Sequence, residues 1–156
     1  EYLAVCRIDE EDLSQIELGE QILEWVGRWR DGETPFRFEF ASEFENKGKG
    51  VWALPPKRGK VYHSDVTLLR VKNGLVLVLV ELVAGFRHQV RSHLGTIGLP
   101  IVGEPLYSNF EEDEDQSLLL HAAAINFTYP NTGKYVRYES DLPERLSFDH
   151  LKTLTE

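Results

Sequence analysis

The segment "VELVAGFRHQVRSHLGTIGLPIVGEPLY", Val80 to Tyr107, joins a run of apolar residues to a helical pattern and then to a series of glycines and prolines. From Arg87 to Ile97 apolar residues recur at helical spacing, and this predicts a helix. Gly98 can supply a left-handed C-terminal cap, and Pro100 prevents the helix from continuing.

Two basic side chains accompany the predicted helix. Because a helix turns by about 100° per residue, Arg91 lies beside the apolar stripe rather than opposite it, and His88 lies one turn earlier. We therefore expect Arg91 at the edge of a cleft.

A β-hairpin is predicted immediately before this helix. The segments "VYHSDVTLLRV" and "LVLVLVELV" flank Asn73-Gly74, the commonest two-residue hairpin turn. The second segment is apolar on both faces, which is typical of a central strand. Further strands are predicted for "EYLAVCRID", "TPFRFEFASEF", "LLLHAAAINFTYP" and "KYVRYESDLP". A short helix that ends near Gly32 is predicted for "ELGEQILEWVGRWRDG". Loops are predicted for "NKGKGVWALPPKRGK", around Val51 to Leu54, and for the acidic segment "NFEEDEDQS".

Composition favours one globular domain. The chain has 156 residues, of which 42% are hydrophobic, enough for a core. Its longest apolar run, Gly74 to Val83, is shorter than the roughly 20 residues that cross a bilayer. Cys6 is the only cysteine, so no internal disulfide can form, and the first residues do not resemble a signal peptide. We expect a cytoplasmic location.

Charge is distributed unevenly along the chain. The net charge is −9, yet Lys47 to Gly95 contains nine lysines and arginines against two acids, a net +7 that leaves −16 for the remainder. Such segregation favours one face that attracts polyanions such as RNA. The alternative is that these charges are scattered over solvated loops.

Several common chemistries do not fit the residues. His88 and His93 are five residues apart, off a common helical face, which argues against a zinc site. The acidic run from Glu111 to Asp115 lacks the glycine and glutamate of a calcium-binding loop, and no Walker, Rossmann or nucleophile-elbow pattern occurs.

Two motifs nevertheless resemble a known family. "AGFRHQVRSHLGTIGLPIVGEPLYS" and "LLLHAAAINFTYPNTGKYVRYESDLPE" are similar to the C-terminal half of the RluA-type pseudouridine synthases, which carry Gly-Arg-Thr-His-Gln-Ile-Arg-x-His-Leu, Gly-x-Pro-Ile-x-Gly-Asp-x-x-Tyr and Leu-His-Ala motifs. The positions in step are Gly85, His88, Gln89, Arg91, His93, Leu94, Gly98, Pro100, Ile101, Gly103, Tyr107, Leu120, His121, Ala122, Pro130, Thr132, Gly133 and Pro143.

The resemblance implies an α+β pseudouridine synthase fold, with a mixed, mainly antiparallel sheet and flanking helices. It also implies isomerisation of uridine in structured RNA, either rRNA or tRNA, without metal or organic cofactor. Arg91 would be the arginine that pairs with the nucleophilic aspartate. Tyr2, in "EYLAV", would pack on the flipped base and transfer a proton at C5; the alternative is a strand tyrosine that only packs on the sheet.

The same resemblance, together with the local charge, nominates RNA contacts at Arg87, His88, Lys57, Arg58 and Lys60. The chain departs from the family motif where Phe86 and Arg87 replace Arg and Thr, and where Glu104 replaces Asp.

The family's nucleophile belongs to a His-Arg-Leu-Asp segment that precedes the tyrosine strand, and this chain contains no such segment. Asp9, Asp12 and Asp65 do not match that motif. We therefore expect residues 1–156 to be the C-terminal portion of a catalytic domain whose nucleophile lies upstream, so that the isolated chain is inactive. Two alternatives are an inactive RNA- or protein-binding module that retains the fold, and an unrelated acidic β-rich interaction domain.

Overall fold

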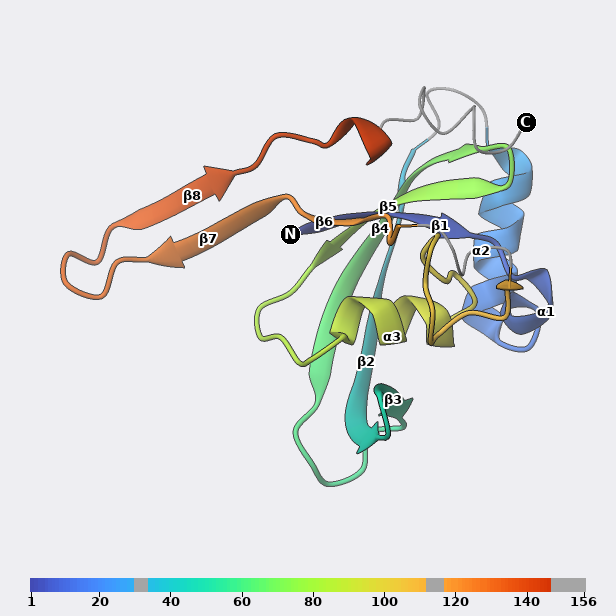
Figure 1. The fold of residues 1–156 in the computed structure, drawn as a ribbon, viewed down its shortest axis with the longest axis horizontal. Coiled ribbons are helices and arrows are strands. Elements are labelled where there is room, and N and C mark those ends of the chain that lie inside the picture. The colour runs from blue at the N-terminus through green and yellow to red at the C-terminus, as the bar shows by residue number, and fades with distance from the viewer. Residues whose placement is uncertain (30–33, 112–116, 147–156) are drawn as a thin grey trace.

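The computed structural model describes residues 1–29, 34–111 and 117–146, which build one curled sheet with helices packed on it (Figure 1). In spatial order the sheet contains β3 (Gly50–Leu54), β2 (Phe36–Lys47), β4 (Tyr62–Lys72), β5 (Leu75–Glu81), β1 (Tyr2–Arg7) and β6 (Leu120–Ala122). Each strand pairing within the described residues is antiparallel. The predicted α+β class with a mainly antiparallel sheet is confirmed.

The β4–β5 hairpin forms as the sequence predicts. Asn73 and Gly74 both have positive φ angles, 51° and 76°, as the central residues of a type I′ turn require. β5 lies between β4 and β1; Val76, Val78 and Val80 are fully buried on one face of the sheet, and Leu77 and Leu79 are partly buried on the other. The predicted central strand is therefore confirmed.

Two helices follow β1. The acidic residues that follow β1 form a short helix, α1 (Glu10–Leu13), whose first turn is capped by the carboxylate of Asp9. The predicted helix is α2 (Glu17–Arg28), which buries Ile22 and Trp25 in the core. Its predicted end near Gly32 lies outside the described residues.

The predicted helix before Gly98 is α3 (Gln89–Thr96), and it ends in a Schellman motif. Gly98 has φ +93°, its N–H donates to the carbonyl of Gly95 at 3.3 Å, and the N–H of Leu99 donates to Leu94 at 2.9 Å. A Cβ atom at Gly98 would also lie 2.8 Å from Cγ of Leu13. The helix begins two residues later than predicted, because His88 adopts a left-handed conformation with φ 57°.

The segment from Val51 to Leu54 is a strand, and the prediction of a loop there was wrong. β3 pairs with the far half of β2, so that Trp52 lies opposite Glu45. The second edge of β3 is held by side chains: Val51 donates its N–H to the hydroxyl of Tyr107 and accepts a bond from Ser92. These partners are distant in sequence, and the local run of Gly, Pro and Lys masked the strand.

The predicted final pair of strands is confirmed in part: the first predicted strand is divided into β6, which pairs with β1, and β7 (Ala124–Thr128), which pairs with β8 (Tyr135–Glu139) in a separate ribbon. This ribbon projects away from the six-stranded sheet (Figure 1). The chain then reaches a 3-10 helix, Glu144–Leu146. Most of the predicted acidic loop, residues 112–116, lies outside the described part of the chain. None of the helices described is long and apolar enough to span a membrane.

Candidate active site

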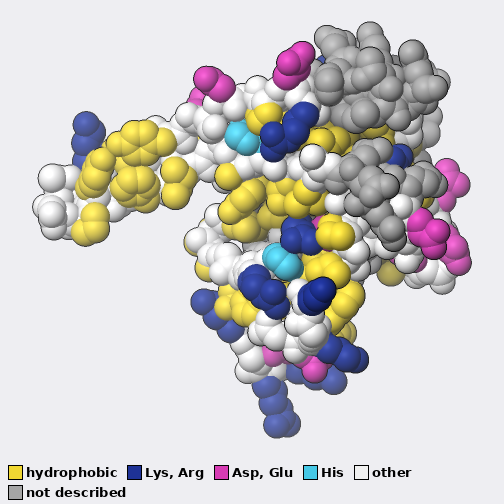
Figure 2. Space-filling view, in the orientation of Figure 1, with side chains coloured by type: hydrophobic (Ala, Val, Ile, Leu, Met, Phe, Trp, Pro, Cys, Tyr) yellow, Lys and Arg dark blue, Asp and Glu magenta, His cyan; other side chains and the backbone are white. Residues whose placement is uncertain are grey.

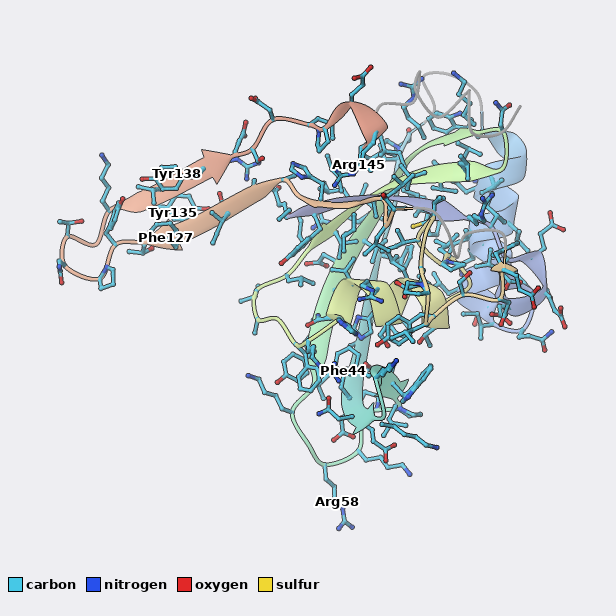
Figure 3. The ribbon with its side chains drawn as sticks, in the orientation of Figure 1. Phe44, Arg58, Phe127, Tyr135, Tyr138 and Arg145 are labelled. Atoms are coloured by element: carbon cyan, nitrogen blue, oxygen red, sulfur yellow. The ribbon has the colours of Figure 1, made fainter. Side chains whose placement is uncertain are left out.

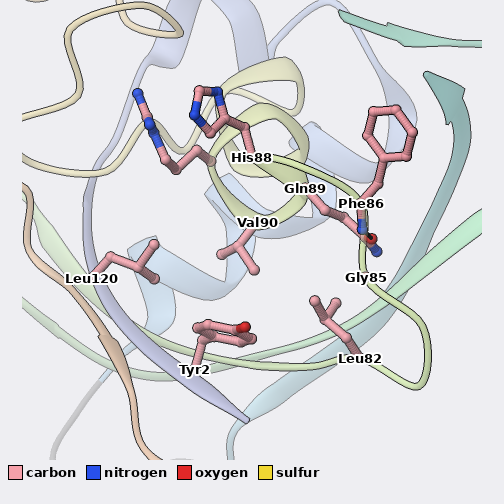
Figure 4. A pocket seen from close by; sticks show the side chains of 9 residues that line it. Tyr2, Leu82, Gly85, Phe86, His88, Gln89, Val90 and Leu120 are labelled. Carbon is pink, nitrogen blue, oxygen red and sulfur yellow. Dashed lines mark hydrogen bonds between the residues drawn. The ribbon is translucent and has the colours of Figure 1, made fainter. Parts of the chain in front are cut away.

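A cavity of about 220 Å³ opens between the N-terminal end of α3, the end of β5 and the start of β1. It brings together three residues nominated from the sequence: Arg91, His88 and Tyr2. The nine lining residues are Tyr2, Leu82, Gly85, Phe86, His88, Gln89, Val90, Arg91 and Leu120. In Figure 4 the ring of Tyr2 lies with Leu82, Val90 and Leu120 on one side of the cavity, and His88 lies across from it. The cavity thus has an apolar wall and a basic, polar wall.

Arg91 is held by a carboxylate that sequence reasoning did not assign to it. Its Nε and Nη2 donate to the two oxygens of Glu104 at 2.8 and 2.7 Å. The Glu104 side chain is fully buried and that of Arg91 is 16% exposed. The hydrogen bonds to Glu104 raise the pKa of Arg91 above its ordinary value. Within the described residues the third guanidinium nitrogen, Nη1, makes no hydrogen bond.

Tyr2 lines the cavity from the first position of β1, between β5 and the edge strand β6. Its backbone lies between Val80 of β5 and Ala122 of β6 in the strand register. The ring is half-buried, packs on the hydrophobic core and also lines the cavity. The position therefore accommodates both the predicted role at the base and the alternative role in sheet packing.

His88 lies at the rim in a conformation that is unusual for a residue other than glycine. Its Nδ1 is 3.0 Å from the hydroxyl of Tyr107, which already accepts the N–H of Val51 at 2.8 Å. The hydroxyl oxygen can accept from both Val51 and His88, so the tautomer of His88 decides which of the two side chains donates in this bond. Burial, then the charges of Arg91 and Arg87, lower the pKa of His88, so the ring is neutral at pH 7.

A buried polar network supports the loop that forms the cavity wall. The ring nitrogens of His93 lie 2.7 Å from the hydroxyls of Ser42 and Ser64, and burial lowers the pKa of His93 to about 4. Gln89 donates to Ser64 at 3.1 Å and accepts the N–H of Phe86 at 3.0 Å. Because both nitrogens of His93 are occupied by serines, neither is free to bind a metal.

The other nominated basic residues lie outside the cavity. Lys57, Arg58 and Lys60 belong to the loop between β3 and β4, and Arg58 points away from the molecule at its lower end (Figure 3). Arg87 lies next to His88 in the chain and turns toward β2, where its Nη2 donates to the side chain of Asn46 at 3.1 Å. Figure 2 shows Lys and Arg side chains from the centre of this face to its lower end.

The cavity lining contains no carboxylate. Asp9 and Asp12 both accept from Asn109 near α1, and Asp65 lies opposite Glu81 across the β4–β5 pair. Glu104 and Tyr107 are the functional candidates that the sequence alone did not single out. Both belong to the recognised motif segment, but their partners depend on the packing of that segment against α3.

The chain is similar to RNA pseudouridine synthases over part of its length. No protein-family model matches it. It is 38% identical over 71 residues to "Uncharacterized RNA pseudouridine synthase YlyB" of Bacillus subtilis (strain 168), which is 46% of this chain and 23% of that protein. It is 37% identical over 78 residues to the ribosomal large subunit pseudouridine synthase C of Escherichia coli (strain K12), which is 45% of this chain and 24% of that protein.

A solved structure shares the fold. The human RNA pseudouridylate synthase domain containing 1 superposes with a TM-score of 0.61 at 19% sequence identity, over 99% of this chain and 64% of that one. The matched segment thus spans about a quarter of these two curated relatives. In sequence over part of its length, and in fold over nearly all of it, the chain is therefore similar to RluA-type RNA pseudouridine synthases.

Proposed function

We propose that this chain forms the arginine and tyrosine side of an RNA pseudouridine synthase active site, which isomerises uridine to pseudouridine in structured RNA, either rRNA or tRNA, in the cytoplasm. The observation that carries the proposal is the cavity in which Arg91 and Tyr2 meet, 89 positions apart in the sequence. The similarity to pseudouridine synthases supports the reaction class.

The cavity suits a base that has left its helix. Flipping a nucleotide costs a few kcal/mol of unstacking, which contact with an aromatic or apolar wall partly restores. Tyr2, Leu82, Val90 and Leu120 supply such a wall. Tyr2 would pack on the uracil and carry a proton at C5; its position in the lining of the cavity supports this role.

Arg91 would orient and ionise the nucleophilic carboxylate. Glu104 occupies Nε and Nη2, so the guanidinium plane is fixed and Nη1 remains for a second acceptor. A guanidinium within about 4 to 6 Å lowers a carboxyl pKa by roughly 1 to 3 units, which keeps the carboxylate in its nucleophilic form. Because the cavity lining has no carboxylate, we propose that this aspartate is supplied by a part of the protein outside the 156 residues.

Tritium release from RNA labelled at uridine C5 tests this function. The intact protein is compared with its Tyr2→Phe variant, which keeps the ring and removes the hydroxyl, and with Tyr135→Phe as the control on the exposed ribbon. We expect release from the intact protein and from the control, and a large loss for Tyr2→Phe. Undiminished tritium release by Tyr2→Phe would contradict the proposed role of the Tyr2 hydroxyl in proton transfer.

A second candidate function is an RNA- or protein-binding module that keeps the fold without the chemistry. The cavity lining without a carboxylate is the observation that favours it. Absence of release by the intact protein, under conditions where another pseudouridine synthase releases label from the same RNA, would favour this second function.

A further inference from the structure

The exposed indole of Trp52 lies beside the candidate active site. Trp52 is 40% exposed on β3 and contacts Tyr107 edge to face, with ring centroids 5.4 Å apart. Tyr107 in turn binds His88 and lies under the guanidinium of Arg91, whose Cζ is 5.5 Å from the ring centroid. One aromatic ring therefore separates Trp52 from two residues of the cavity.

The strand that carries Trp52 is fixed to the active-site helix. Ser92 of α3 donates to the carbonyl of Val51 at 2.7 Å, and the N–H of Val51 donates to Tyr107 at 2.8 Å. Both backbone groups of the neighbouring residue are thus tied to the site. Arg87 adds a bond to the β2–β3 turn through the carbonyl of Lys49, at 3.4 Å.

The indole of Trp52 packs on Gly50. A Cβ atom at Gly50 would lie 3.1 Å from Cζ2 of Trp52, so the ring packs closely over this glycine and any larger residue would displace it. Gly50 and Tyr107 therefore orient the ring while much of it stays in solvent. An oriented, exposed aromatic ring loses little conformational entropy when a second ring stacks on it.

The segment of chain that carries Trp52 is basic. Residues 47–60 contain Lys47, Lys49, Lys57, Arg58 and Lys60 and no acidic residue. The carboxylate of Glu43, on the neighbouring strand, is engaged by the backbone N–H groups of Lys57 and Gly59. Glu45 lies opposite Trp52 in the β2–β3 register and is the acidic exception. A stacking ring among cations is the arrangement that binds unpaired nucleotides.

We propose that Trp52 is a stacking platform for an unpaired nucleotide next to the target uridine, with the phosphates on either side held by the cations of residues 47–60. The inference rests on the proposed function, because it takes RNA as the substrate. It adds a named subsite and predicts a preference for unpaired flanking nucleotides. Stacking is tolerant of base identity, so this subsite reads strandedness rather than sequence.

Binding of a fluorescently labelled single-stranded oligouridylate to the intact protein, measured by anisotropy, tests the subsite. Trp52→Leu removes the ring and keeps an apolar side chain, and we expect binding about 10-fold weaker. Trp52→Phe should restore most of the affinity. Leu54→Ala is the matched control, because Leu54 lies two residues along the same strand and is 41% exposed; we expect no change.

Salt dependence separates stacking from charge. Trp52→Leu should leave the slope of log affinity against log salt unchanged, whereas Lys57→Ala or Arg58→Ala should each reduce it by about 1. A Trp52→Leu protein with unaltered melting temperature and wild-type RNA affinity overturns the proposal, and so does a Trp52→Phe protein that binds as weakly as Trp52→Leu. A protein that binds RNA through Trp52 but releases no tritium would contradict the proposed catalysis and leave this inference standing.

Discussion

The α3 site and the β7–β8 ribbon each hold an arginine against carboxylates, but in opposite environments. Arg91 meets a fully buried Glu104. Arg137, whose side chain is 41% exposed, meets Glu1 at 2.5 Å and Glu139 at 2.8 Å, and hydrogen bonds to these carboxylates raise its pKa. Water solvates Arg137 and Glu139, which are 41% and 68% exposed, when they separate, whereas the buried carboxylate of Glu104 has no such substitute for its partner. We therefore expect the Arg91–Glu104 ion pair to contribute much more to the stability of the fold than the ion pairs of Arg137.

The apolar faces of the two regions differ in the same way. Val90 and Leu94 of α3 are buried in the core. Ile125, Phe127 and Tyr138 share one face of the ribbon and are 58%, 37% and 53% exposed, although Phe127 stacks on Tyr138. A two-stranded ribbon is marginally stable alone in water. We expect the amides of the ribbon to exchange with solvent faster than those of β4 and β5.

The largest expected difference concerns catalysis. If the proposed function holds, Arg91→Ala should lower kcat/KM of the intact protein for uridine isomerisation by about 1,000-fold, because it removes the group proposed to orient the nucleophile. Arg91→Lys should recover little, since an ammonium cannot bond Glu104 and a second carboxylate in one plane. Arg137→Ala is the control and should retain near wild-type activity. The kinetics of tritium release measure kcat/KM for all three variants. Equal losses of activity for Arg91→Ala and Arg137→Ala would contradict the assignment of catalysis to the α3 site.

The next difference concerns stability. Glu104→Ala leaves the guanidinium of Arg91 partly buried and unpaired, and we expect it to lower the free energy of unfolding by about 3 kcal/mol. Glu139→Ala, the matched change in the ribbon, should have a much smaller effect because its carboxylate is 68% exposed. Urea denaturation of both variants measures the contrast. A Glu104→Ala protein as stable as the wild type would show that solvent reaches Arg91 freely.

His93, in the α3 region, should make stability depend on pH in the mildly acidic range. His93 has a pKa of about 4 in the fold against 6.5 in a free side chain, so the unfolded chain binds a proton that the folded chain does not. The contribution of the neutral ring is complete above pH 6.5 and is lost as the pH falls from 6.5 to 4. Linkage gives about 2 to 3 kcal/mol for this loss.

Comparison of the wild type with His93→Asn isolates this term, because other groups titrate equally in both proteins. The variant should be less stable at pH 7 and should lose less stability than the wild type between pH 6.5 and 4.5, measured by urea denaturation. Parallel pH profiles would exclude His93 as the titrating group.

The smallest effect is expected on the ribbon surface. Tyr135 is 67% exposed, and Tyr135→Ala should change the free energy of unfolding by less than about 0.5 kcal/mol. Leu94→Ala, in the buried face of α3, should cost about 2 to 5 kcal/mol. Thermal or urea unfolding provides both values. A cost above 1 kcal/mol at Tyr135 would show that the ribbon packs more tightly than its exposure indicates.

Local sequence was a good guide wherever local chemistry decides the backbone. Asn73-Gly74 predicted the turn between the central strands, and Gly98 predicted the end of α3, because positive φ angles are costly for other residues. It failed at β3, whose pairing with β2 and whose bonds to Tyr107 and Ser92 come from distant residues. It also placed the start of α3 too early, since nothing in the pattern reveals the left-handed conformation of His88.

The candidate site also has features that the sequence predicts and features that only the tertiary structure shows. The motif around Arg91 and the tyrosine of the first strand could be recognised from the order of residues, because both lie within short segments of characteristic composition. The shared cavity, the bidentate pairing of Arg91 with Glu104 and the serines on both nitrogens of His93 depended on the tertiary structure. Side chains as far apart as Ser42 and His93 meet only after the sheet has curled against α3. By itself the sequence nominated the residues of the candidate site and the main elements of the fold. Packing decided what each of these residues faces, because burial and hydrogen-bond geometry are properties of the folded chain.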